Sequence, residues 1–476
     1  MNYSQFLNMI PEATLVLALI IVFCADFALH RSERKGFVLG VLTGALLICQ
    51  MVSCLLAEPA TAFGGLYVTT PIVSVMKAIL TAGSFIVIVM AQEWLKTTRY
   101  QGEFYLLVIS TLLGMYMMMS SGSFLMFFLG LEMASVPLSC LVAFDKKKKE
   151  SAEAAAKYIL VATFSSGVML FGISFVYAAT GTLYFDDVAR QLIATPLAIM
   201  GMVFFFSGLG FKISLVPFHF WTADTYQGAP TPVTGYLSVV SKGAAALTLA
   251  VILMKVFTFM TDYWQPMLYI VIVLSITIAN LFAIRQKELK RFMAFSSISQ
   301  AGYIMLAVIG NSAAGIAALT FYVLVYVVAN MSVFTVISAV EQNGGSTQMS
   351  AYNGLYQTNP KLSLLMTIAL FSLAGIPPFA GMFSKFFVFM AGVGGHEQAP
   401  FWPYFVVFIA LVNTVVSLYY YLLIVKAMYI TKEEHPLPTF RNAKSVNLSL
   451  AICTLGILLC GVCSCVYEWI SSAATM

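Results

Sequence analysis

Four ionisable side chains stand inside stretches of the chain that are otherwise almost wholly apolar: Glu132, Lys212, Lys242 and Lys385. An isolated buried carboxylate tends to bind a proton and an isolated buried amine tends to lose one, because burial disfavours the charged form. When groups of these two kinds lie near one another, they can share charge and exchange protons. We therefore interpret the four residues as a proton relay.

A static buried ion pair is the competing interpretation. A pair between Glu132 and Lys212 would fix the packing of two helices, but a buried ion pair is weak evidence for stability. It would also account for the burial of Lys212 alone and would leave the burial of Lys242 and Lys385 unexplained. A charged side chain at the centre of a bilayer costs about 3 kcal/mol or more, so such residues usually have a function. The relay explains the whole set better.

Lys157 differs from these lysines because it lies only about one turn inside the cytoplasmic end of its predicted helix, in EAAAKYILVATFSSG. Its long side chain could reach the membrane surface, or it could be the point where protons enter the relay. Both interpretations stay open.

The helices that position the lysines must be interrupted, because proline lacks a backbone donor and clashes with the preceding turn. Between Lys212 and Lys242 stand Pro217, Gly228, Pro230 and Pro232. The segment that carries Lys385 contains Gly375, Pro377, Pro378 and Gly381. Each break therefore lies beside a lysine, a pattern typical of the transport sites of repeat-built carriers.

Composition places the chain in a membrane. Of its 476 residues, 60% are apolar and 9% are charged, whereas about a quarter of a soluble domain is charged. A bilayer core requires apolar runs of about 20 residues, and we predict fourteen of them. They lie near 10–30, 36–57, 71–91, 104–120, 122–143, 154–179, 195–218, 232–256, 265–284, 294–310, 314–340, 361–391, 402–430 and 446–470. The predicted fold is an all-α membrane protein with about 14 transmembrane helices.

The two broken helices are the seventh and the twelfth, five spans apart. This distance predicts two five-helix repeats, spans 4–8 and spans 9–13, and an odd number of spans per repeat gives them opposite orientations. We therefore divide the chain into four parts. These are an N-terminal three-helix segment (1–100), a first repeat (101–260), a second, inverted repeat (261–435) and a C-terminal helix (436–476).

Basic residues are distributed unevenly among the connectors. Connectors after even-numbered spans contain only Arg190, whereas those after odd-numbered spans contain many lysines and arginines. Because cytoplasmic loops are enriched in basic residues, we predict that the odd connectors are cytoplasmic and both termini periplasmic. Lys77, Lys255 and Lys426 lie near span ends, and we interpret them as structural residues.

Metal and redox chemistry are not predicted within this chain. The eight cysteines form no disulfide framework and have no oriented shell of further ligands. The four histidines lie in different connectors or helix ends, which leaves no buried pair for haem: His30, His219, His396 and His435. No dinucleotide fingerprint or phosphate loop stands out. We expect no cofactor, no metal and no nucleic-acid partner.

Five stretches resemble a known family: FLGLEMASVPLSCLVAF, SAEAAAKYILVATFSSGVMLFG, GFKISLVPFHFWTADTYQGAPTPVTGYLSVVSKGAA, KELKRFMAFSSISQAGYIMLA and FSLAGIPPFAGMFSKFFVF. They cover spans 4 to 12, and the third is specific. Through them the chain resembles the subunit N family, antiporter-like membrane subunits of the proton-pumping NADH-quinone oxidoreductase, respiratory complex I. The sister subunit M resembles this chain but has a glutamate on the helix of Lys385, and the chain lacks room for the long lateral helix of subunit L.

The resemblance implies fourteen helices with two inverted repeats, and it implies that Glu132 and the lysines at 212, 242 and 385 belong to the family's central polar axis. The implied function is proton translocation across the bacterial inner membrane, coupled to quinone reduction elsewhere in the complex. NADH, FMN, iron–sulfur clusters and quinone would then belong to partner subunits. Expected neighbours are subunit M, small membrane subunits such as K and J, and lipid.

One residue departs from the family pattern. The family often has a histidine where this chain has Gln300, and glutamine cannot titrate. An alternative function is that of a subunit of a multi-subunit sodium/proton antiporter, which shares most of these motifs and needs no redox partner. A carrier of an organic solute is a third hypothesis with little support.

Overall fold

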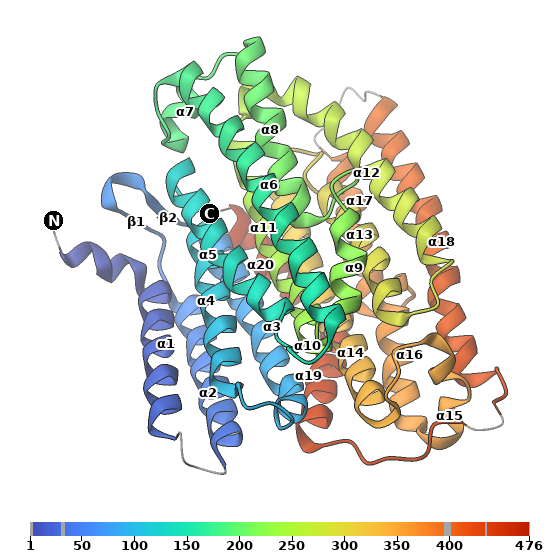
Figure 1. Cartoon of the computed structure of the whole chain (residues 1–476). Coiled ribbons are helices and arrows are strands. Elements are labelled where there is room, and N and C mark those ends of the chain that lie inside the picture. The colour runs from blue at the N-terminus through green and yellow to red at the C-terminus, as the bar shows by residue number, and fades with distance from the viewer. Residues whose placement is uncertain (1–2, 30–33, 395–400, 434–435, 476) are drawn as a thin grey trace.

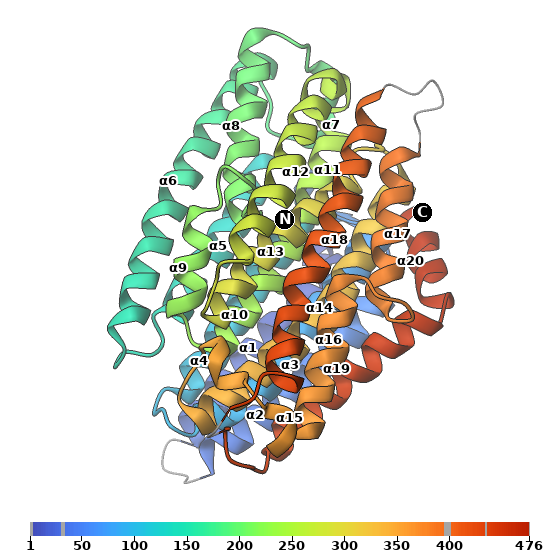
Figure 2. The ribbon, with the colours of Figure 1, turned by 90° about the vertical axis from the view of Figure 1, so that its right-hand side faces the viewer.

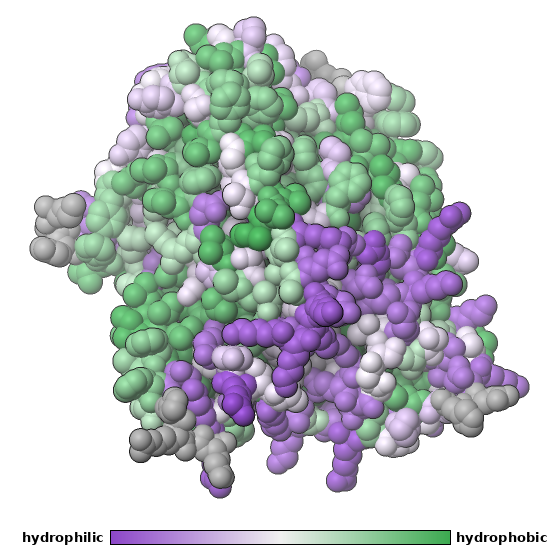
Figure 3. All heavy atoms as spheres, in the orientation of Figure 1, coloured by the Kyte–Doolittle hydropathy of each residue, from purple (hydrophilic) through white to green (hydrophobic). Residues whose placement is uncertain are grey.

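The computed structural model describes residues 3–29, 34–394, 401–433 and 436–475. Nearly all of them are helical, and the long helices lie side by side along one general direction (Figure 1 and Figure 2). Apolar side chains cover much of the face in Figure 3, while hydrophilic side chains gather over its lower right part. The prediction of an all-α membrane fold is confirmed.

The N-terminal part contains three long helices: α1 (Ile10–Ala28), α2 (Lys35–Leu56) and α3 (Pro71–Leu95). A 3-10 turn, Tyr3–Met9, precedes α1. Strands β1 (Ala60–Ala62) and β2 (Tyr67–Thr69) form a small hairpin before α3, which was not predicted from the sequence. Its turn, Phe63–Gly65, has positive φ at all three residues, a conformation that glycine adopts without a steric cost.

The next part begins with three unbroken helices: α4 (Gln101–Met119), α5 (Phe124–Val142) and α6 (Lys149–Thr180). The short helix α7 (Phe185–Gln191) follows. The seventh span is broken as predicted into α8 (Pro196–Ile213) and α9 (Phe220–Gly228). The eighth consists of α10 (Thr231–Tyr236), a π-helical segment (Leu237–Ser241) and α11 (Lys242–Lys255).

The second half follows the same plan. After a 3-10 turn, Thr258–Met260, come α12 (Thr261–Ala283), α13 (Leu289–Leu306) and α14 (Ala313–Gly344). A 3-10 turn (Met349–Tyr352) and the short α15 (Leu355–Thr358) lead to the twelfth span, which is broken as predicted into α16 (Pro360–Ala374) and α17 (Ala380–Val393). The last helices are α18 (Phe401–Tyr429), α19 (Lys444–Val462) and α20 (Cys465–Thr475).

The number of spans agrees with the prediction once the polar and broken helices are included. Twelve helices in the described residues are long and apolar enough to cross a membrane. The other two of the fourteen predicted spans are α13, which contains several serines and a glutamine, and the pair α16–α17, whose halves are short because of the break. The last predicted span, 446–470, is divided, because the backbone is extended at Cys463.

The two halves share the plan of their third and fourth spans. The third helix of each, α6 or α14, has 32 residues and ends at a glycine with a left-handed φ, Gly181 or Gly345. The fourth helix of each is the broken one. Lys148, at the start of α6, forms an ion pair with Glu341 near the end of α14. The two long helices therefore run in opposite directions, as inverted repeats require.

Contacts among the connectors divide the molecule into two ends. At one end, Tyr67 of the hairpin pairs with Ser121 after α4, and Ser123 pairs with Tyr184 after α6. At the other end, Glu288 before α13 pairs with Gln348 after α14. Even-numbered and odd-numbered connectors thus gather at opposite ends, in agreement with the predicted order of crossings.

The orientation in the membrane remains a prediction that fusion reporters can test. Reporters at Lys148 and Arg441 should face the cytoplasm, because the basic connectors lie at that end. Reporters at Gly64 and after Met476, which lies outside the described residues, should face the periplasm. A cytoplasmic signal from the Met476 fusion would require an odd number of spans and would contradict the assignment.

Candidate functional site

Lys212 lies in the last turn of α8, directly before the break in the seventh span. The helix ends because Ser214 adopts a left-handed φ of 69°. The Lys212 side chain is buried, and its Nζ donates hydrogen bonds to Ser135 Oγ at 2.8 Å and to Tyr158 OH at 3.2 Å. The break thus places this amine among hydroxyl groups of α5 and α6.

Glu132 stands one turn before Ser135 on α5, close enough to Lys212 for an electrostatic interaction. The two do not form a direct ion pair among the described residues, as the competing interpretation of a static pair would require. Ser135 is the nearer partner of the Lys212 amine. Glu132 itself is half-buried, and its Oε1 atom is buried without a hydrogen-bond partner among the described residues.

Lys242 is the first residue of α11, immediately after the π-helical segment. Such segments are rare and often occur at functional sites, because each inserts one residue into the helical ladder. The Nζ of Lys242 donates to Ser297 Oγ of α13 at 2.5 Å. The same serine oxygen lies 3.2 Å from the hydroxyl of Tyr226, and the amine stands 5.3 Å from the centre of that tyrosine ring. This second amine is likewise buried among hydroxyl groups.

Lys385 lies on α17, beside the break in the twelfth span. Helix α16 ends at Gly375, whose φ is 88°, and a Cβ there would lie 3.1 Å from Cδ of Lys385. The Lys385 Nζ donates to the carbonyl oxygen of Ala374, at the C-terminal end of α16, at 3.0 Å. A cation is favoured at that end of a helix by the helix dipole. The break therefore creates the site of this amine.

Helix α13 connects the surroundings of Lys242 with those of Lys385. Ser297 contacts Lys242, and Gln300, one turn later, borders a cavity of about 10 Å³ that Lys385 also lines. Gln300 accepts a hydrogen bond from Tyr322 and donates to Tyr421 OH at 3.2 Å. Hydroxyl and amide groups thus extend from one lysine to the other.

Several of these polar partners were not predicted: Ser135, Tyr158, Tyr226, Ser297, Tyr322 and Tyr421. They lie on helices other than that of the lysine or glutamine they contact, at sequence separations that no local pattern reveals. One feature of the sequence does indicate a polar site in this region. The stretch KRFMAFSSISQAGY in α13 is unusually rich in serine and glutamine for a membrane span, and both Ser297 and Gln300 belong to it.

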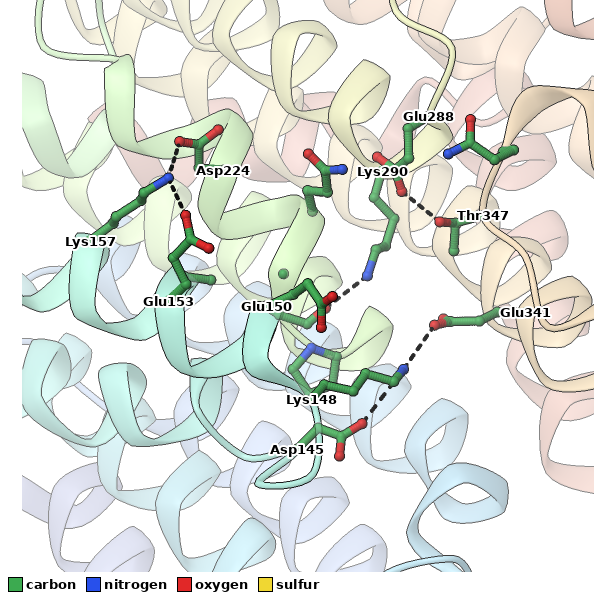
Figure 4. A pocket seen from close by; sticks show the side chains of 16 residues that line it. Asp145, Lys148, Glu150, Glu153, Lys157, Asp224, Glu288, Lys290, Glu341 and Thr347 are labelled. Carbon is green, nitrogen blue, oxygen red and sulfur yellow. Dashed lines mark hydrogen bonds and ion pairs between the residues drawn. The ribbon is translucent and has the colours of Figure 1, made fainter.

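Lys157 lies at the rim of a polar cavity of about 360 Å³ at the end where the odd-numbered connectors meet (Figure 4). Its Nζ forms ion pairs with Glu153 at 2.7 Å and with Asp224 at 2.8 Å. Asp224 also pairs with Arg291 at 2.6 Å. Lys290, another residue of this cavity, lies between two of the predicted spans, yet it is buried and donates to the carbonyl of Ala229 at 2.9 Å.

The three lysines interpreted as structural behave differently from one another. Lys426 is exposed, and Lys255 is partly exposed and pairs with Asp186 at 2.8 Å. Lys77 does not reach the interface. It is fully buried and pairs with Glu12 at 2.6 Å.

Histidine and cysteine provide no metal-ligand cluster among the described residues. His219 is buried beside Phe220, at the start of α9. The other histidines, His30, His396 and His435, lie outside the described residues.

Comparison with known proteins places this arrangement in a family. Residues 121–417, more than half of the chain, match the family described as NADH:quinone oxidoreductase/Mrp antiporter, TM. A protein named NADH-quinone oxidoreductase subunit N from Phocaeicola vulgatus is 56% identical over 480 residues, covering 100% of both chains. The chain belongs to the subunit N family of NADH-quinone oxidoreductase. It is thus an antiporter-like, multi-pass membrane subunit of a multi-subunit enzyme complex.

Solved structures agree with membership of the subunit N family. A chain of respiratory complex I from Thermus thermophilus with bound aureothin is 31% identical, with a TM-score of 0.79, and the match covers 95% of this chain and 97% of that one. A chain of the Mrp complex from Dietzia sp. has a TM-score of 0.86 over 100% and 97% of the two chains, but at 19% identity it shows the fold alone. Family membership supports proton translocation as the role of the chain.

The electrostatic relation between Glu132 and Lys212 can be tested with a double-mutant cycle. Each single substitution, Glu132→Ala or Lys212→Ala, should lower the amount of assembled complex, because it leaves an uncompensated charge in the membrane. The double variant should assemble better than the two losses combined predict, since it removes both charges. The coupling energy is derived from the amounts of assembled complex in the single and double variants. A coupling energy within about 0.3 kcal/mol of zero would show that the two residues do not interact.

Proposed function

We propose that this chain moves protons across the membrane along an axis of Glu132, Lys212, Lys242 and Lys385, driven by quinone reduction in partner subunits. The proposal rests on the hydrogen-bond partners of the three lysine amines. In the described residues each donates to neutral oxygen atoms, and none forms an ion pair. A static pair would instead hold each amine in its charged form.

The neutral partners suit a group that changes its protonation state. Serine and tyrosine hydroxyls can accept a hydrogen bond from an ammonium group and donate one to a neutral amine. Ser135 and Tyr158 surround Lys212 in this way, and Ser297 contacts Lys242. These hydroxyl groups can therefore stabilise both the charged and the neutral form of Lys212 and Lys242 without large rearrangement.

The step from Lys242 to Lys385 can use the polar groups of α13 and its neighbours. The cavity that Gln300 and Lys385 line is about 10 Å³, close to the minimum that one water molecule requires. Gln300 does not titrate, but its amide both donates and accepts, and it holds the hydroxyls of Tyr322 and Tyr421. We propose that Gln300 orients the hydrogen bonds of this path and does not itself bind a proton.

Protons can enter from the polar cavity of Figure 4 along α9. Asp224 of α9 faces that cavity, where Lys157 and Arg291 hold its carboxylate. Two residues later, Tyr226 lies beside Ser297 and Lys242. The same short helix thus borders both the cavity and the axis, and we assign Lys157 to the point where protons enter.

The surroundings of Glu132 suggest that a neighbouring subunit packs nearby. One of its oxygens is buried but has no described hydrogen-bond partner, and about half of α5 is exposed in the isolated chain. We propose that other membrane subunits, such as the antiporter-like subunit M and the small subunits K and J, pack against the chain and that one of them covers this face. NADH, FMN, iron–sulfur clusters and quinone would be bound by partner subunits. The complex would lie in the bacterial inner membrane.

The alternative function, in a sodium/proton antiporter, is suggested by the description of the matching family, which also names the Mrp antiporter. The higher identity to proteins named NADH-quinone oxidoreductase subunit N, over the whole chain, favours the first proposal.

Substitution of Lys242 distinguishes a titrating residue from a fixed charge. Arginine keeps the positive charge but does not release its proton at accessible pH, whereas a buried lysine can. Lys242→Arg should therefore lower quinone-linked proton pumping nearly as far as Lys242→Ala, since loss of a proton-transfer group slows its step by about 100-fold or more. Lys255→Arg, at the partly exposed end of the same helix, should pump normally.

The measurement is proton uptake and quinone reductase rate in inverted membrane vesicles, normalised to assembled complex. A sodium-free medium excludes pumping that depends on sodium/proton exchange. Wild-type pumping by Lys242→Arg, combined with poor pumping by Lys242→Ala, would show that Lys242 acts only through its charge.

A further inference from the structure

A second buried charge cluster lies outside the proposed axis, in the N-terminal three-helix segment. Lys77 of α3 has no exposed surface, and its Nζ lies 2.6 Å from Oε1 of Glu12 near the start of α1. The amine also stands 5.4 Å from the ring centres of Tyr67 and Tyr116. An ionisable pair at this depth has no role in the relay described so far.

Hydrogen bonds lead from the pair toward the end of the molecule where the even-numbered connectors meet. Tyr67, in strand β2 of the hairpin, donates its hydroxyl to Oε2 of Glu12 at 2.9 Å. Ser120, which follows α4, donates to Oε1 of Glu12 at 3.4 Å. Its neighbour Ser121 is half-buried and pairs with the hairpin. Tyr67 and Ser120 are themselves buried, so the half-buried Ser121 is the member of this group nearest to the surface.

Hydroxyl groups also lead from the pair toward the centre of the molecule. Tyr116 OH lies 3.2 Å from the backbone oxygen of Lys77 and shares a hydrogen bond with Thr81, one turn further along α3. Ser84 is the next polar residue on the same face, because positions 77, 81 and 84 are three or four residues apart. Ser84 lies beside the hydroxyl of Tyr236, which is bonded to Thr111 at 2.7 Å.

The inner end of this stripe meets the helix that carries Lys242. Tyr236 immediately precedes the π-helical segment, and Gly83 of α3 packs so closely against that segment that a Cβ would lie 3.1 Å from Val240. Gly243, next to Lys242, packs in the same way against Leu80 of α3. Seven residues of helix separate Lys77 from Ser84, a rise of about 10 Å.

We propose that Glu12 and Lys77 form a proton-release branch that carries protons from the surroundings of Lys242 along α3 to the periplasmic surface. A proton that reaches the Thr81 and Tyr116 hydroxyls passes to Glu12 by way of Lys77, whose Nζ lies 2.6 Å from Oε1 of Glu12 and 5.4 Å from the centre of the Tyr116 ring. The ammonium group gives one proton to the carboxylate and takes up the arriving one, so Lys77 is charged again after the step. The carboxyl group then gives this proton to Tyr67 or Ser120 as that hydroxyl releases its own outward. One proton enters and one leaves, and only N–H and O–H bonds are broken and formed. The branch rests on the proposed function of the lysine axis.

A static ion pair that only fastens the hairpin to α1 and α3 is the rival explanation. It requires the two charges but has no use for the hydroxyls that continue the path on either side. Replacement of those hydroxyls, with both charges kept, therefore separates the two explanations and avoids the severe effect of leaving one buried charge unpaired.

The test uses the complete complex in proteoliposomes, with Tyr67→Phe and Tyr116→Phe as the two variants. Each removes one hydroxyl and leaves the ring and the Glu12–Lys77 pair in place. The matched control is Tyr105→Phe on the same helix as Tyr116, because the buried Tyr105 hydroxyl has no hydrogen-bond partner among the described residues. Lys242→Arg is measured in parallel as the reference for a complex in which proton transfer along the lysine axis is lost.

The measured quantity is the number of protons taken up per quinone reduced. We expect Tyr67→Phe and Tyr116→Phe to lower this ratio as much as Lys242→Arg does, and Tyr105→Phe to leave it unchanged. Wild-type ratios in Tyr67→Phe and Tyr116→Phe, alongside a loss in Lys242→Arg, would overturn the branch and leave the axis intact. An equal loss in Tyr105→Phe would also overturn it, since the effect would then come from packing. A wild-type ratio in Lys242→Arg would instead contradict the axis itself.

Discussion

A lysine amine buried in a membrane protein must find oxygen atoms inside the protein, because no water surrounds it to replace them. A regular helix cannot provide them, since its backbone carbonyls are already used within the helix. The chain meets this constraint by interrupting its helices. The break after α8 places Lys212 among hydroxyls of α5 and α6, and the break after α16 leaves the Ala374 carbonyl free for Lys385. At Lys242 the interruption is smaller, a π-helical segment.

Two kinds of lysine site result from this constraint. Lys77 and Lys157 have carboxylate partners at 2.6 to 2.8 Å, whereas Lys212, Lys242 and Lys385 have neutral ones. A carboxylate partner favours the charged amine, so a paired lysine is charged at rest. Neutral partners tolerate both the charged and the neutral form of the amine. The difference separates Lys77 and Lys157, which carboxylates hold in the charged form at the two ends of the proposed proton path, from the three lysines of the proposed axis.

Much of this arrangement could be predicted from the sequence, because it depends on local properties. Apolar run length determined the spans, and Pro217 and the pair Pro377–Pro378 marked the two breaks. The partners of the amines could not be predicted, because they come from distant helices. Ser297 is 55 residues from Lys242, and Glu12 is 65 residues from Lys77. Glu12 lies in the first turn of its own helix, where Tyr67 of the hairpin and Lys77 of α3 contact its buried carboxylate.

The most direct test of proton transfer by Lys242 is an infrared difference spectrum of the assembled complex, recorded as quinone is reduced. Labelling of lysine with 15N identifies ammonium bands, and comparison with the Lys242→Arg protein assigns them to one residue. We predict a band that changes during quinone reduction, shifts with the label and is absent from the Lys242→Arg spectrum. A wild-type spectrum without any lysine band that depends on Lys242 would contradict the relay.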